Sequence, residues 1–158
     1  MKTTLALVLS FVLSPAFAQS DSFSLLKEKF KRQEDVVSFS TSGFFARTIL
    51  LMAGEHEFTD AIKDVKKIHL ITIPKAAFTE VGVSVKGFKN VLVKDSFDQL
   101  ANIKDDGDDV TIYLQSTKSK DNRYVILIEE GTEVVAIEIR GYIDIAKLME
   151  NESLTYNH

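Results

Sequence analysis

The last third of the chain alternates apolar and polar residues, and this pattern predicts two β-hairpins. In the first, the alternation runs up to Asp106–Gly107 and resumes after it, and Asp-Gly is a preferred two-residue hairpin turn. Closing the chain there pairs Ile103 with Val110. A slip of one residue would move the apolar side chains of one strand to the opposite face, so the pattern favours this register.

The second hairpin is predicted with Glu130–Gly131 at its turn, which sets Ile126 against Val135 and Arg123 against Glu138. Ile126 and Val135 belong to one apolar face. The other face holds Val125, Leu127, Val134 and Ala136. This hairpin is therefore apolar on both sides, unlike a strand pair that presents one face to water.

A short amphipathic helix is predicted near the start of the chain. Phe23, Leu26 and Phe30 recur at the spacing of one helical face, and lysines occupy the positions between them. Asp21 or Ser22 precedes this pattern and can act as its N-cap.

The middle of the chain mixes helical and strand patterns. Strands are predicted at residues 37–41 and 67–74, and an amphipathic helix at 58–65. Residues 43–54 are apolar nearly all round, which predicts either a buried helix or a segment that docks under the sheet. Residues 76–94 combine helical spacing with alternating valines and two helix-weakening glycines, and we expect a helix there.

These elements predict one α+β domain over residues 19–158. Adjacent hairpins make the sheet largely antiparallel, and the expected architecture is a two-layer sandwich with helices on one face. A closing helix is expected to begin at Asp144 and to run through Ile145, Leu148 and Met149.

Residues 1–18 have the layout of a secretory signal peptide: one lysine, an apolar run over residues 5–13, and a small-residue ending at Ala18. The run is shorter than the roughly 20 residues that a membrane span needs. We therefore expect cleavage after Ala18 and a periplasmic or secreted protein. Because no cysteine lies near the cleavage point, we expect no lipid anchor.

Composition narrows the function. The 158-residue chain has no cysteine, which excludes thiol catalysis, redox relay and cysteine-based zinc sites. A chain of this size buries about two-thirds of its unfolded surface, so it can be stable without disulfides. The net charge of −4 disfavours nucleic acid as a partner, since a mildly acidic chain repels phosphates.

The segments FDQLANIKDDGDDVTIYL and YVILIEEGTEVVAIEIRGYIDIAKL, after a leader and a helix rich in Phe and Lys, resemble the DUF4252 family of small exported bacterial domains. The resemblance covers most of residues 23–150 and is weakest over 76–94. It implies an α+β domain in the envelope or outside the cell, and it supplies no functional residues. Many members carry a lipidated cysteine, which this chain lacks.

Four aspartates around Gly107 are the weak metal candidates: Asp105, Asp106, Asp108 and Asp109. An EF-hand loop with Gly107 at its sixth position would place Lys104 and Tyr113 at ligand positions, which excludes that motif. A looser calcium site or a plain hairpin turn stay open, and no cofactor is expected. The chain also lacks the G-x-S-x-G, H-E-x-x-H and phosphate-loop motifs.

The predicted registers gather apolar side chains on one side of the sheet. The candidate binding residues there are Leu100, Tyr113, Val125, Leu127 and Val134, joined by Ala136. Either a helix or the apolar segment 43–54 covers them, or they form an exposed patch for self-association or for a partner.

The sequence therefore predicts an exported, non-enzymatic domain that binds a partner protein or a small apolar ligand through its sheet, with a homo-oligomer as one form of this. The alternative is a calcium-binding domain or an unfamiliar enzyme that uses carboxylates such as Asp105 and Glu129. Catalysis of that kind needs carboxyl groups held together in a cleft.

Overall fold

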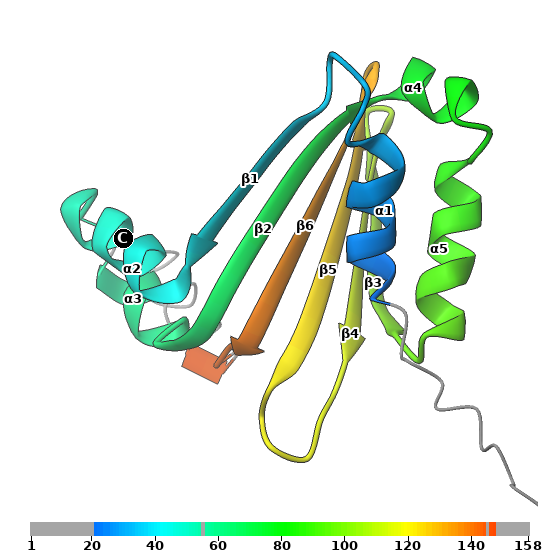
Figure 1. The fold of residues 1–158 in the computed structure, drawn as a ribbon. Helices are drawn as coiled ribbons and strands as arrows, with labels where there is room; N and C mark the ends of the chain where they lie inside the picture. Colours follow the sequence, from blue (N-terminus) through cyan, green and yellow to red (C-terminus); the bar gives the residue numbers. More distant parts are fainter. Residues whose placement is uncertain (1–20, 55, 145, 148–158) are drawn as a thin grey trace, which may run out of the picture.

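The computed structural model describes residues 21–54, 56–144, 146 and 147. Their strands form one antiparallel sheet in the order β1-β2-β6-β5-β4-β3 (Figure 1). The strands are β1 (Val37–Ser42), β2 (Asp64–Pro74), β3 (Asp98–Asp105), β4 (Asp108–Gln115), β5 (Asn122–Glu130) and β6 (Glu133–Tyr142). The predicted α+β class with an antiparallel sheet is confirmed.

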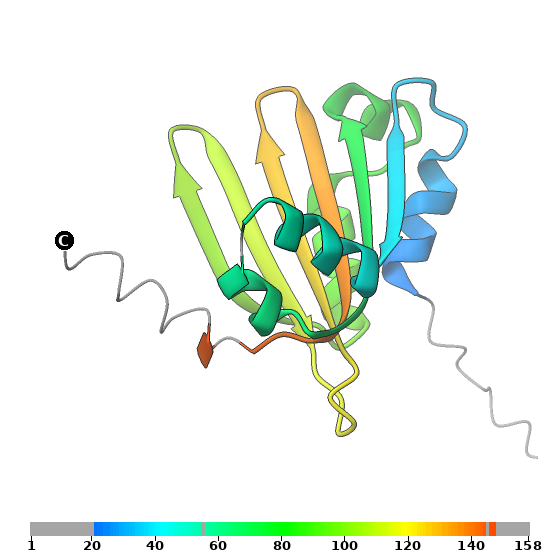
Figure 2. The same cartoon turned by 90° about the vertical axis from the view of Figure 1, so that its left-hand side faces the viewer.

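Helices lie on both faces of this sheet. One face, called here the inner face, lies beneath α1 (Ser22–Phe30), α4 (Lys75–Glu80) and α5 (Val85–Lys94), as Figure 1 shows. On the opposite face, the outer face, α2 (Gly43–Met52) and α3 (His56–Ala61) cross one end of the strands (Figure 2). The expectation that helices gather on one face therefore holds for α1, α4 and α5 but not for α2 and α3.

The hydrophobic core lies between the inner face and its three helices. Phe23, Leu26 and Phe30 of α1 are buried there, as the helical spacing predicts. The rings of Phe30 and Phe78 pack with centroids 4.7 Å apart, which joins α1 to α4. The N-cap of α1 is Asp21, whose carboxylate accepts a hydrogen bond from the Ser24 N–H.

The β3–β4 hairpin has the predicted register, with Ile103 opposite Val110. Gly107 has φ +98°, a value that glycine adopts without strain. The predicted β5–β6 register is wrong by two residues: Ile126 faces Ile137, because Gly131, with φ +47°, is the first turn residue and not the second. A shift of two residues leaves every side chain on its predicted face.

The stretch 76–94 is helical for most of its length, as expected, but it forms two helices. The break between α4 and α5 contains Gly82, with φ +68°. Ser84 then caps α5 by accepting a hydrogen bond from the Gly87 N–H at 3.0 Å. The alternating valines that resemble a strand are thus the linker between two helices.

The outer helix α2 docks on β2 through a glycine. A Cβ at Gly43 would lie 1.7 Å from the Val65 carbonyl oxygen, and a Cβ at Gly141 would lie 2.8 Å from Val65 Cα. Both glycines therefore permit close backbone packing where the β2–β6 register shifts, between Val65 and Lys67. The predicted closing helix lies mostly outside the described residues, although the Lys147 N–H donates to Asp144 Oδ1, as an N-cap would require.

Candidate functional site

The predicted binding residues lie mainly in the core. Tyr113, Val125, Leu127 and Val134 are at most 2% exposed, beneath the inner helices, together with Ala136. The sequence left open whether these side chains are covered or form an exposed patch. In the structure, helices cover them. These side chains are therefore not available to a partner in this conformation. Leu100 is half exposed, but it lies in the register shift between Gln99 and Ala101 and is separated from the others.

The outer face is apolar as well, and helices cover only one end of it (Figure 2). A row of directly paired residues crosses all six strands of the sheet without a polar side chain. Its members, in sheet order, are Phe39, Leu70, Ile137, Ile126, Ile112 and Ala101. Phe39 is 54% exposed, and the other five are partly buried. An antiparallel sheet with one solvated face normally presents polar residues there, and this row departs from that pattern.

A second row lies beside the first, towards the end of the sheet away from α2. It consists of Val37, Thr72, Val135, Ile128, Val110 and Ile103. Val37 and Ile103, at the two edges, are 63% and 55% exposed. Thr72 on β2 is the polar member of this row, so the two rows together are apolar on the other five strands.

Of the two alternatives for residues 43–54, the fully buried helix is wrong, because α2 packs on the sheet through one part only. Ser42 caps the helix, yet Phe44 is 72% exposed, Phe45 52%, Ile49 50% and Met52 84%. The helix contacts β1 and β2 at its start and α3 along its side. Much of its apolar surface therefore adds to that of the outer face. A helix that is apolar nearly all round is compatible with burial inside the domain and equally with burial against a partner. The sequence pattern alone therefore did not distinguish a covered α2 from an exposed one.

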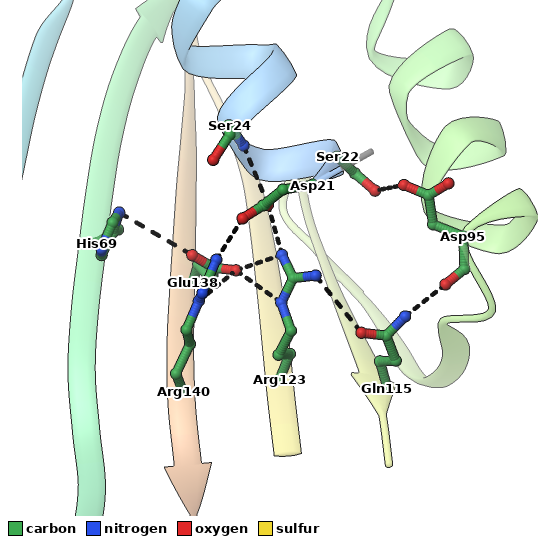
Figure 3. A network of polar contacts seen from close by, with 9 residues as sticks. All are labelled: Asp21, Ser22, Ser24, His69, Asp95, Gln115, Arg123, Glu138 and Arg140. Carbon is green, nitrogen blue, oxygen red and sulfur yellow. Dashed lines mark hydrogen bonds and ion pairs between the residues drawn. The ribbon is translucent and has the colours of Figure 1, made fainter. Parts of the chain in front are cut away.

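A buried ionic network lies under the N-terminus of α1, on the inner face (Figure 3). Glu138 is 1% exposed. Its carboxylate accepts hydrogen bonds from Arg123 at 2.6 and 3.0 Å and lies 3.3 Å from Arg140 Nε. Both arginines also donate to the Asp21 carboxylate. The network therefore ties α1 to strands β5 and β6.

The charges of this network determine the ionisation of Asp21. Burial acts to raise the pKa of Asp21, but the Ser24 N–H and the two guanidinium groups outweigh it and hold the pKa below its usual value. Two arginines between two carboxylates balance the local charge, and Glu138 is fully buried while the side chains of Asp21 and Arg140 keep partial contact with solvent. This arrangement stabilises the position of α1 and offers no open site to a substrate.

His69 is the unexpected member of this region. Neither of its ring nitrogens has a hydrogen-bond partner among the described residues. Nδ1 lies 4.0 Å from the Glu138 carboxylate, and the ring packs edge-on against Phe23. Burial lowers the pKa of His69, which the Glu138 charge opposes only in part. The sequence could have pointed to this region, because Glu138 lies two residues after Ala136 and four after Val134 and therefore faces the core with them.

The aspartates at the β3–β4 turn are not brought together around a common point. Asp105 pairs with Asp108 across the turn. Asp109 accepts hydrogen bonds from Asn102 and Thr111, and these with the lysines Lys89 and Lys104 outweigh desolvation and lower its pKa. In the described part of the chain, no group of three or more His, Asp or Glu side chains is arranged to hold a metal ion.

The other catalytic candidate, Glu129, forms an ion pair with Lys89 at 2.7 Å, and this lysine also lies 3.7 Å from Asp109. Burial acts to lower the pKa of Lys89, but the two carboxylates outweigh it and raise that pKa. The ammonium is therefore held charged between them. Asp105 stays exposed at the turn, so the structure does not join Asp105 and Glu129 in a cleft.

Comparison with protein families gives one match. The model of the family described as "Domain of unknown function (DUF4252)" matches residues 30–151, which include all six strands of the sheet and helices α2 to α5. Comparisons with curated proteins and with solved structures returned no match. Within the described residues, no helix is long and apolar enough to cross a membrane.

Proposed function

The chain belongs to the DUF4252 family, and because that family supplies no activity, we propose a function from the surface alone: the domain binds a partner protein through the outer face of its sheet. The partner adds an extended segment to β1 and lays apolar side chains on the outer face and α2. The row from Phe39 to Ala101, apolar on every strand, is the observation that carries this proposal.

The two edges of the sheet differ in a way that supports β1 as the docking edge. The β3 edge carries Asp98, Lys104 and Asp105, and charges on an edge strand discourage pairing with another chain. The β1 edge, VSFSTS, carries no charge and no proline. A strand added there would place alternate side chains on the outer face beside Phe39, which is the geometry of β-strand addition.

Export belongs to the same proposal. Residues 1–18 act as a cleaved signal peptide, so the partner meets the domain in the periplasm or outside the cell. A mature chain that retains Met1 by intact-mass analysis would contradict this part and leave the docking surface unaffected.

Site-specific photo-crosslinking tests the docking surface. Benzoylphenylalanine placed at Phe39 in the full chain, expressed in its own cells, should form a discrete protein adduct. The same probe at Asn90, exposed on α5, should form none. Replacement of Phe44 and Phe45 by serine should abolish the Phe39 adduct, since these exposed rings extend the same apolar surface.

The mass of the adduct identifies the kind of partner. An adduct of two copies of this chain makes the protein a homo-oligomer, and any other mass indicates a different protein. A strict monomer in light scattering, together with no dye binding to apolar surface and no position-dependent adduct, would refute the proposal.

A further inference from the structure

A groove separate from the outer face lies between the antiparallel helices α1 and α5, which run side by side in Figure 1. Its volume is about 440 Å³, within the range of roughly 300–1,000 Å³ that is typical of small-molecule sites. The apolar side chains that line it are Leu25, Leu26, Phe30, Val83, Phe88 and Val91. The groove is therefore an apolar channel between two helices and not a gap between charged side chains.

Gly87 leaves the wall of this groove open. Glycine inside a helix costs roughly 1 kcal/mol relative to alanine. A Cβ at Gly87 would meet Ser84 Oγ at 3.1 Å and no other side chain of the described residues within 4 Å. Packing within the domain therefore does not require a glycine at this position. A side chain here would instead project into the space between α1 and α5.

One end of the groove carries a single lysine. Lys29, near the end of α1, is the charged residue of its lining, and no carboxylate among the described residues pairs with it. Because the helices are antiparallel, the N-terminus of α5 and the C-terminus of α1 lie at this same end, so their dipoles oppose each other and Lys29 supplies the charge. The opposite end is closed by the hydrogen bond from Ser22 to the Asp95 carboxylate. Lys29 thus gives one end a cation that an anionic group can pair with, and the rest of the lining favours an apolar chain.

We propose that the α1–α5 groove binds a free, single-chain amphiphile with an anionic head group, such as a long-chain carboxylate. The chain lies along Leu25, Phe88 and Val91, and the head group pairs with Lys29. The groove, at about 440 Å³, accommodates one chain and not a two-chain lipid. This site shares no residue with the outer face and does not depend on the partner proposed above.

Calorimetric titration of the purified full-length protein tests the site, with dodecanoate below its micelle concentration as the probe. We expect one equivalent to bind. Gly87→Leu, which fills the groove while improving helix propensity, should weaken binding at least tenfold. Asn90→Leu, a matched change on the exposed side of α5, should leave binding unchanged.

A second set of titrations tests whether Lys29 binds the head group. Lys29→Gln should weaken dodecanoate binding severalfold and leave 1-dodecanol, which has the same chain without the charge, unaffected. Leu25→Glu should weaken dodecanoate without a risk to folding, because Leu25 is 48% exposed.

Three outcomes would overturn the proposal: unchanged affinity in both Gly87→Leu and Leu25→Glu, binding of many equivalents without saturation, or loss of binding in Phe44→Ser/Phe45→Ser instead. The last result would place the amphiphile on the outer face. Absence of the photo-adduct together with intact dodecanoate binding would refute the proposed partner protein and support the proposed α1–α5 groove site.

Discussion

At the scale of single residues, Glu138 shows how a charged side chain can be part of the core. It shares the inner face with Val134 and Ala136, yet two arginines and a histidine surround its carboxylate. A buried charge is tolerated when its partners are in place, and removing one partner leaves the others uncompensated.

Glu138→Ala should therefore destabilise the domain by about 3–5 kcal/mol, the usual cost of breaking a buried ion pair. The free energy of unfolding in urea measures this change. Glu133→Ala, an exposed glutamate on the same strand, is the control and should change the free energy by no more than about 0.5 kcal/mol. Equal effects of the two substitutions would mean that the network contributes no stability.

His69 should make the stability of the domain depend on pH. Because the folded protein lowers the pKa of His69 below 6.5, the unfolded chain takes up a proton first as the pH falls. The stabilisation is complete above about pH 6.5 and is lost as the pH falls towards the folded pKa. The wild type should therefore lose stability relative to His69→Gln as the pH falls below about 6.5.

Urea midpoints of the two proteins across this range give the measurement. The Asp21 carboxylate titrates in both proteins, so its contribution, lost only at more acidic pH because its folded pKa is lowered, cancels in the difference. A His69 resonance that titrates above pH 6.5 would contradict the prediction.

At the scale of elements, the pattern of apolar and polar residues predicted helices and strand registers correctly where the contacts join residues close in sequence. The α1 spacing, its Asp21 cap and the β3–β4 register all depend on residues a few positions apart. The β5–β6 register was misjudged by two because Gly131 can serve as either turn residue, and the alternation is the same in both registers. In the observed register, β6 also pairs with β2, and this long-range pairing cannot be read from the local sequence of the hairpin.

The β3–β4 turn supplies a prediction at this scale. Gly107→Ala should destabilise the domain by roughly 1–2 kcal/mol, because a Cβ is disfavoured at φ +98°. Asp106→Gly, with φ +43° beside it, should be nearly neutral in the same urea experiment. If both substitutions were neutral, the turn would not hold the register of the hairpin.

At the scale of the whole molecule, the exposed aromatic residues of α2 and the buried ones of the core have different roles. Phe44 is 72% exposed and Phe78 is 5% exposed. Under the proposed function, a partner would cover the exposed Phe44, whereas Phe78 stabilises the isolated domain.

The matched pair Phe44→Ala and Phe78→Ala separates these roles. Phe78→Ala should cost about 3–5 kcal/mol, since it removes a buried ring. Phe44→Ala should change the free energy of unfolding by no more than about 0.5 kcal/mol and should reduce the binding of an apolar-surface dye. A large loss of stability in Phe44→Ala would mean that α2 is structural and would weaken the case for docking.

The pattern of apolar residues along the chain was enough to predict the antiparallel hairpins, helix α1 and the two apolar faces of β5 and β6. It could not determine which face is covered, because alternation assigns residues to two sides without saying on which side distant helices pack. The tertiary structure places α1, α4 and α5 over Val125 and Leu127, and it leaves Ile126 and Ile137 on the open side. Burial of the first set excludes it from binding, and exposure of the second makes the outer face the surface to test.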